Sequence, residues 1–160
     1  MQFKYFDFAV YGGISNQRYG EAAFQLAPDE ALIIETNMPE KCRYWSIHTM
    51  DDHAFLVDWL NRQANLNDFN SKIDADGVFR AVVSARDPGV PNWIDNAGYK
   101  TGSIQSRWER CSSYPDHVVT KVKVADVRNY LPAETPVVSA EERDAAIRLR
   151  RKGAQMRRRW

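Results

Sequence analysis

The chain has 160 residues, of which 44% are apolar, 12% aromatic and 27% charged. This composition is typical of one globular domain and excludes a disordered or fibrous chain. The 22 basic and 21 acidic residues nearly cancel, so the total charge indicates neither a general nucleic-acid-binding protein nor a polyanion mimic.

Most of the chain consists of short apolar-rich segments separated by Gly, Pro, Asn and Asp. This spacing is typical of all-β sandwiches and barrels. A first strand is expected within residues 3–11, and the other predicted strands are residues 21–27, 31–37, 42–50, 77–85, 103–110 and 117–124. Seven strands predict a sandwich of two sheets.

The alternation of side chains predicts which face of each strand meets the core. In strand 77–85 the odd-numbered positions are apolar, so Arg80 is expected to point away from the main core. In strand 42–50 both faces mix apolar and polar side chains, with Trp45 on one side and His48 on the other. We expect this strand to line a pocket or a subunit contact.

Two connections have less regular patterns. Residues 86–102, RDPGVPNWIDNAGYKTG, contain two prolines and three glycines, which predicts one long loop. Trp93, Ile94 and Tyr99 favour a packed loop, and packed long loops commonly carry function. Residues 53–70 are compatible with a short helix or with an extra edge strand.

The C-terminal segment has helical features. Ser139 and Glu142 form a capping box, so a helix is predicted to begin there. The apolar stripe of this helix is predicted to be Ala145, Ala146, Leu149, Met156 and Trp160. From Ser139 onward the net charge is +5, whereas the rest of the chain is −4. We interpret the tail as a basic helix that docks on the acidic body or on a neighbouring subunit.

The two cysteines, Cys42 and Cys111, are too few for a disulfide framework. We expect free thiols in a reducing compartment, and hence a cytoplasmic protein. The N-terminal MQFKYFDFAVYGG lacks the apolar segment and cleavage site of a signal peptide. No stretch of about 18 apolar residues occurs, which predicts the absence of a membrane span.

Catalytic and metal-binding patterns are weak. His48 and His53 flank Asp51 and Asp52, and a three-histidine metal site would need His117 to approach them. We predict no metal and no cofactor. No nucleophile elbow or phosphate-binding glycine loop occurs. A hydrolase or lyase in which His48 acts as general base with Asp51 or Asp52 remains an alternative.

Several segments place an aromatic ring beside a hydrogen-bonding group, as small-molecule pockets require. We expect Trp93 to be a stacking platform, with Asn92 and Asp95 orienting the ligand and an arginine binding an anionic group. The predicted ligand-binding residues are Arg43, Trp45, Arg80, Asn92, Trp93, Asp95, Arg107 and Trp108.

Four motifs stand out: PDEALIIE at residues 28–35, CRYWS at 42–46, DxDGxFR at 74–80 and DPGVPNWID at 87–95. They resemble the domain-of-unknown-function family DUF1214. Arg107 with Trp108, and LPxxTP with ER over residues 131–143, complete the resemblance, which covers about residues 19–151. It implies a jelly-roll-like β-sandwich that often follows a second β domain in longer, oligomeric proteins. It implies no catalytic residues.

We therefore predict an all-β, jelly-roll-like β-sandwich with a C-terminal α-helix. Residues 1–20 are interpreted as an aromatic segment left from an upstream domain, residues 21–132 as the sandwich and residues 133–160 as the basic helix. The predicted function is small-ligand binding, or an accessory role in a larger or oligomeric protein. The alternatives are the hydrolase or lyase and an oligomerisation module whose interface is strand 42–50. Predicted partners are a small molecule and either a second copy of the chain or a second β domain, with no nucleic acid.

Overall fold

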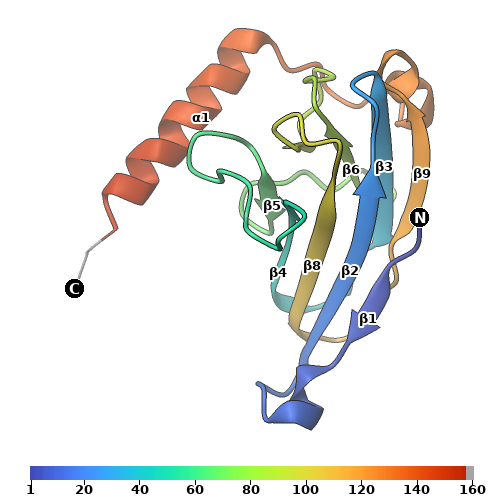
Figure 1. The fold of residues 1–160 in the computed structure, drawn as a ribbon, viewed down its shortest axis with the longest axis vertical. Coiled ribbons are helices and arrows are strands. Elements are labelled where there is room, and N and C mark those ends of the chain that lie inside the picture. Colours follow the sequence, from blue (N-terminus) through green and yellow to red (C-terminus); the bar gives the residue numbers. More distant parts are fainter. Residues whose placement is uncertain (158–160) are drawn as a thin grey trace.

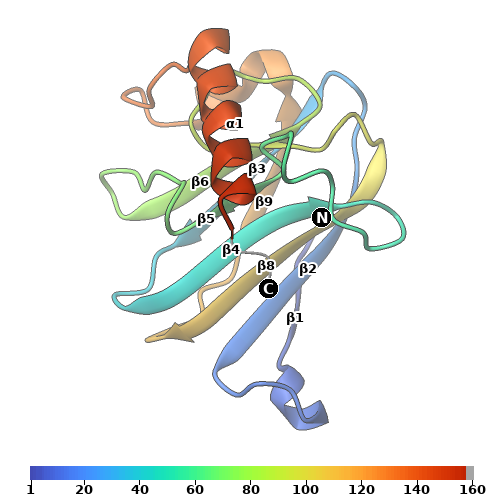
Figure 2. The ribbon, with the colours of Figure 1, turned by 90° about the vertical axis from the view of Figure 1, so that its left-hand side faces the viewer.

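Nine β-strands form two sheets in this computed structural model, which describes residues 1–157 (Figure 1). One sheet has the strand order β1-β2-β8-β4-β5, and the other has the order β7-β6-β3-β9. Figure 2 shows the five-stranded sheet in front of the four-stranded sheet. The strands are β1 Lys4–Phe6, β2 Gln17–Gln25, β3 Glu30–Asn37, β4 Cys42–Met50, β5 Asn65–Asn67, β6 Val78–Ser84, β7 Trp93–Asp95, β8 Thr101–Cys111 and β9 Val118–Lys123.

The helices are the 3-10 helices η1 (Phe8–Tyr11) and η2 (Val124–Tyr130) and the α-helix α1 (Ala140–Gln155). The prediction of a two-sheet, mostly β domain with a C-terminal helix is therefore confirmed. The jelly-roll topology stays a prediction. In the described part of the chain no helix is long and apolar enough to cross a membrane.

Residues 86–102 are more ordered than predicted. Trp93–Asp95 forms β7, which pairs in parallel with Val82–Ser84 of β6, and β8 already begins at Thr101. The prediction of one long loop was wrong because its central strand depends on a pairing partner outside the segment. The expected packing of this segment is confirmed, since Val90, Trp93 and Ile94 are all buried. Within residues 53–70 the edge-strand alternative is correct, because β5 pairs with β4.

The four-stranded sheet is buried on both faces. Leu32, Ile34, Phe79 and Val83 face the core between the sheets, where Trp45 and Trp108 meet them from the other sheet. The opposite face packs into a second core made of Ala31, Ile33, Val82, Val90, Trp93, Val122 and Val127, which η2 helps to cover. Both faces of β3 are therefore apolar, and β3 is the central element of the domain.

The N-terminal segment joins the sandwich directly. β1 pairs with β2 in antiparallel register, and Phe3 is 5% exposed within the core between the sheets. The domain boundaries predicted at residues 20 and 132 stay a prediction.

Cys42 and Cys111 lie directly opposite each other on β4 and β8, and a disulfide joins them. Our expectation of free thiols was therefore wrong. The two cysteines lie 69 positions apart in the sequence, and nothing local links them. The antiparallel register of β4 and β8 brings their sulfur atoms together. The cytoplasmic location rested on free thiols, and it stays a prediction.

Helix α1 begins as predicted, because Ser139 and Glu142 satisfy each other's backbone N–H groups. The face that meets the body differs from the predicted apolar stripe. Leu149 and Met156 are exposed, and Trp160 lies outside the described residues. The positions that face the body are Arg143, Ile147, Arg150 and Ala154, whose spacing follows one side of a helix.

Two arginines make most of the polar contacts between α1 and the body. Arg143 is 9% exposed and bonds Asp87, Gln63 and the Val90 carbonyl. Arg150 bonds the Asn65 side chain, its carbonyl and the Trp59 carbonyl. The basic tail therefore docks on its own body through buried or half-buried guanidinium groups.

Candidate functional site

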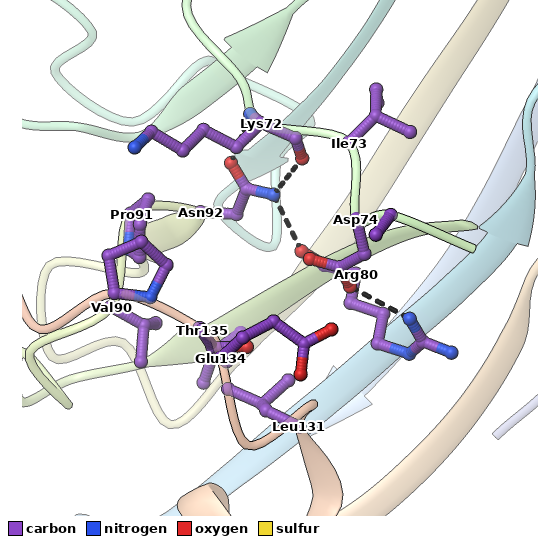
Figure 3. A pocket seen from close by; sticks show the side chains of 13 residues that line it. Lys72, Ile73, Asp74, Arg80, Val90, Pro91, Asn92, Leu131, Glu134 and Thr135 are labelled. Atoms are coloured by element: carbon purple, nitrogen blue, oxygen red, sulfur yellow. Dashed lines mark hydrogen bonds and ion pairs between the residues drawn. The ribbon is translucent and has the colours of Figure 1, made fainter. Parts of the chain in front are cut away.

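A cavity of about 210 Å³ lies beside β6 (Figure 3). Four segments build it: the turn before β6, the first half of β6, the segment before β7, and the linker between η2 and α1. Its lining residues are Lys72, Ile73, Asp74, Ala75, Arg80, Val82, Val90, Pro91, Asn92, Leu131, Glu134, Thr135 and Pro136.

Asn92 ties two of these walls together. Its Oδ1 accepts from the Lys72 N–H at 2.8 Å, and its Nδ2 donates to the Lys72 carbonyl at 2.6 Å and to the Arg80 carbonyl at 2.8 Å. Figure 3 shows this amide bridging the turn and the strand. Because Asn92 is buried and its polar atoms are satisfied, its role is to position the cavity wall.

The linker of residues 131–136 closes the cavity from the other side. Arg128 donates to the carbonyls of Gly89, Thr135 and Pro136, and the Val138 N–H donates to the Gly89 carbonyl. These bonds hold the linker against the segment that precedes β7. Arg128 thus joins Gly89 and Thr135, which lie about 45 residues apart in the chain. The cavity depends on this long-range contact.

Arg80 forms one charged wall of the cavity. Its Nε bonds Glu35, its Nη1 bonds Asp74 and its Nη2 bonds Asp76, each at 2.8 Å. The hydrogen bonds from Arg80 hold the pKa of Asp76 below its usual value, and the three carboxylates raise the pKa of Arg80. As predicted, Arg80 points away from the main core.

Three polar groups of the lining have no hydrogen-bond partner among residues 1–157: the Lys72 ammonium, the Glu134 carboxylate and the Thr135 hydroxyl. Lys72 and Glu134 are exposed, whereas the Thr135 Oγ1 atom is buried. A buried hydroxyl without a partner costs free energy unless something else satisfies it. The cavity thus combines apolar walls with two exposed charged groups, Lys72 and Glu134, that make no ion pair among residues 1–157.

The structure brings only two of the predicted ligand-binding residues, Arg80 and Asn92, to this cavity. Trp93 is 8% exposed in the second core, where its Nε1 donates to Ser84 and the Arg143 guanidinium lies 5.2 Å from its ring. Its indole ring is therefore engaged by the protein itself. Asp95 is buried and pairs with Arg62 at 2.8 Å.

The other predicted residues lie on or inside the five-stranded sheet. Trp45 and Trp108 are buried in the core between the sheets, and the Trp108 Nε1 has no partner in residues 1–157. Arg43 is exposed on β4. Arg107 of β8 lies over the Tyr19 ring at 4.7 Å. These four residues do not share a cavity with Arg80 and Asn92.

The candidate catalytic residues do not form a dyad. Burial and the nearby Arg107 charge lower the pKa of His48 to about 4. Asp51 accepts from the backbone N–H groups of His53 and Phe55, and Asp52 accepts from the Thr101 hydroxyl at 2.7 Å. No hydrogen bond links His48 to either carboxylate in the described residues. Within residues 1–157, no three His, Cys, Asp or Glu side chains could together hold a metal ion.

The linker of residues 131–136 and Lys72 line the cavity but are not among the ligand-binding residues that the sequence predicts. The linker's LPAETP run, with two prolines, contributes to the family resemblance. Proline disfavours helices and central strands, so this run predicts a segment without regular secondary structure. The sequence of the linker does not reveal that it packs beside β6.

The fold defines a two-sheet β domain, with a small, partly open cavity beside β6. The family model for DUF1214, described as a protein of unknown function, matches residues 20–107, more than half of the chain. The chain belongs to this family, as its motifs predicted. Among proteins with curated descriptions, none matches the sequence.

Two solved structures are similar. An uncharacterized protein from Burkholderia cenocepacia is 30% identical with a TM-score of 0.72, over 78% of this chain and 35% of that one. A protein from Vibrio parahaemolyticus is 18% identical with a TM-score of 0.53, over 66% of this chain and 31% of that one. The second likeness shows the fold alone. The chain matches about a third of the length of each.

Proposed function

We propose that this domain binds a small, partly apolar molecule in the cavity beside β6. The cavity itself is the observation that carries the proposal. Apolar walls with a few polar groups are the usual make-up of small-molecule sites. At about 210 Å³ the cavity is smaller than typical drug-sized pockets, which favours a compact ligand.

The walls support binding because they are built in advance. Asn92 fixes the turn, and Arg128 fixes the linker, so little has to be ordered when a ligand enters. Preorganised sites lose less conformational entropy on binding than flexible ones.

The test is a fragment screen by ligand-observed NMR on the parent protein and two variants. Ala75 lines the cavity from an exposed turn, so Ala75→Trp is expected to fill the entrance without disturbing the core. Ala23→Trp is the matched control, because Ala23 is exposed on the other sheet. Fragments should lose binding to the first variant and keep it to the second. Fragments that bind both variants equally would reject this cavity as the site.

Self-association is a second candidate function, favoured by an apolar tip at the N-terminal end. We define the tip as Phe6, Phe8, Val10, Tyr11 and Ile14, which are all exposed, Tyr11 by 85%. In Figures 1 and 2 the tip around η1 lies at the opposite end of the molecule from the start of α1. Contiguous exposed apolar side chains mark interaction surfaces in many proteins.

This second proposal differs from the interface predicted on strand 42–50, because the tip lies in β1, in η1 and in the segment after η1 rather than on β4. Light scattering during size-exclusion chromatography would test it. A dimer that Val10→Ser with Tyr11→Ser converts to a monomer supports the tip. The control is Val137→Ser, which changes an exposed valine of the linker. A monomer at every concentration would reject self-association.

A further inference from the structure

We propose that the ligand of the cavity beside β6 is a small organic cation: an ammonium group carried on an alkyl or aryl body. This inference rests on the proposed function of the same cavity and names the class of ligand.

The first step is that Arg80 is not available to an anion. Glu35, Asp74 and Asp76 surround it, and all three guanidinium nitrogens donate to these carboxylates. This cluster of three carboxylates and one guanidinium group has a net charge of −2, although only Arg80 and Asp74 line the cavity. The donors of Arg80 are already used by these carboxylates, so an anionic ligand would gain few hydrogen bonds from Arg80. The same carboxylates would repel it.

The second step is that Glu134 adds another carboxylate. It belongs to the linker that closes the cavity, and it has no ion pair among residues 1–157. Figure 3 shows its carboxylate on the side of the cavity toward Arg80, between that residue and Leu131. The Lys72 ammonium extends in the opposite direction in the same view. The four charged residues that line the cavity, Lys72, Asp74, Arg80 and Glu134, sum to zero. The Glu35 and Asp76 carboxylates, which lie outside the lining and bond Arg80, bring the total to −2.

The third step concerns the remaining lining. An ammonium group carries several N–H donors and no acceptor, so it complements the exposed Glu134 carboxylate. Val82, Val90, Pro91 and Leu131 offer apolar contact to the rest of the ligand. These apolar walls favour an organic cation over a metal ion, which requires several oxygen ligands.

Three probes of similar shape test the charge preference: phenethylamine, 2-phenylethanol and 3-phenylpropionate. Their dissociation constants are measured by NMR titration of the methyl resonances of Val82 and Val90. We expect phenethylamine to bind at least about tenfold more tightly than 3-phenylpropionate, because the Glu134 carboxylate attracts the ammonium group and repels the carboxylate. The alcohol should lie between them.

Glu134→Gln keeps the shape and removes the charge. We expect it to weaken phenethylamine about tenfold and to leave 2-phenylethanol unchanged. The control is Glu141→Gln, which removes an exposed carboxylate of α1 outside the cavity and should change neither constant. Because Glu134 is exposed, its substitution is not expected to disturb folding.

The outcomes separate this inference from the proposed function. Tighter binding of the carboxylate or the alcohol, lost in Ala75→Trp, would overturn the cation while leaving the cavity as a ligand site. Amine binding that Glu134→Gln does not weaken would overturn the role of Glu134. If no probe shifts the valine resonances and no fragment responds to Ala75→Trp, the proposed function fails and this inference fails with it.

Discussion

Arg143 of α1 donates from its Nε to Oδ2 of Asp87 at 2.8 Å, which joins the C-terminal helix to the segment that leads into β7. The Arg143 side chain is only 10% exposed, and it also bonds Gln63 and the Val90 carbonyl. Val90 lines the cavity, so the same guanidinium group supports both the helix and a wall of the candidate site.

We predict that Arg143→Ala lowers the free energy of unfolding by about 3 kcal/mol, because it leaves the Asp87 carboxylate and buried acceptors without their donor. Urea unfolding followed by circular dichroism measures this change. Arg151→Ala, at an exposed position of α1, is the control and should change stability by less than about 0.5 kcal/mol. Equal stability of the two variants would show that the buried contacts of Arg143 contribute nothing.

Two half-buried histidines, His48 and His117, predict a pH dependence of stability. Burial lowers the pKa of both His48 and His117 from 6.5 to about 4, although the Asp116 carboxylate opposes this change at His117. The unfolded chain therefore binds more protons than the folded chain between pH 6.5 and 4. The stabilisation that comes from the neutral histidines should be fully present above about pH 6.5 and should fall as the pH is lowered to about 4. Below about pH 4 these two groups should cause no further loss of stability.

The neutral form of His117 also fits its contacts. Its backbone N–H donates to the Tyr5 oxygen at 2.6 Å, which leaves the Tyr5 hydroxyl hydrogen free to donate to Nδ1 at 3.1 Å. We expect each histidine to lower the free energy of unfolding by roughly 2 kcal/mol when the pH is lowered from 7 to 5. Urea unfolding across this range should give a shallower slope for His48→Gln and for His117→Gln than for the parent. The double variant should be shallower than either, and an unchanged slope would contradict the prediction.

The disulfide between Cys42 and Cys111 predicts sensitivity to reductant. It closes a loop between residues 69 positions apart, and cross-linking such a loop restricts the unfolded chain by about 4 kcal/mol in the chain-entropy model. Reduction should lower the free energy of unfolding by up to that amount, and mass spectrometry after alkylation should count the released thiols. The double variant Cys42→Ser, Cys111→Ser should show no response to reductant. Free thiols in the untreated protein would refute the pairing.

Two glycines should respond to alanine with opposite signs. A Cβ at Gly102 of β8 would clash with the Met50 carbonyl and the Phe24 ring, so Gly102→Ala should cost roughly 1–3 kcal/mol. Gly153 lies within α1 with nothing within 4 Å of an added Cβ. Gly153→Ala should therefore raise helix stability by up to about 1 kcal/mol. Thermal unfolding of both variants checks the signs, and a stabilised Gly102→Ala would show that β8 does not pass this close to β4.

Much of the fold could be predicted from the sequence because its signals are local. Strand 42–50 was predicted with its observed ends, and Ser139 caps the helix as expected. Alternation correctly placed Phe79 and Val83 in the core and Arg80 away from it. Each of these predictions needs only side-chain periodicity or a hydrogen bond between residues a few positions apart.

The candidate site was less accessible to prediction. Trp93 was expected at a ligand, yet it packs in the second core, because its strand pairs with β6 and η2 helps to cover that side of the sheet. No motif or periodicity in the sequence marks Glu134 and Thr135 as residues of a cavity. They line the cavity only because Arg128 holds the linker against the Gly89 carbonyl.

Motifs and local signals were enough to predict a β domain of the DUF1214 family with a capped C-terminal helix. The pairing of the cysteines, the buried face of the basic helix and the place of the cavity became visible only in the folded chain. These three features depend on contacts between residues far apart in the sequence. Local periodicity specifies the direction of a side chain from its own backbone, but only the packing of sheets, linker and helix specifies what that side chain meets.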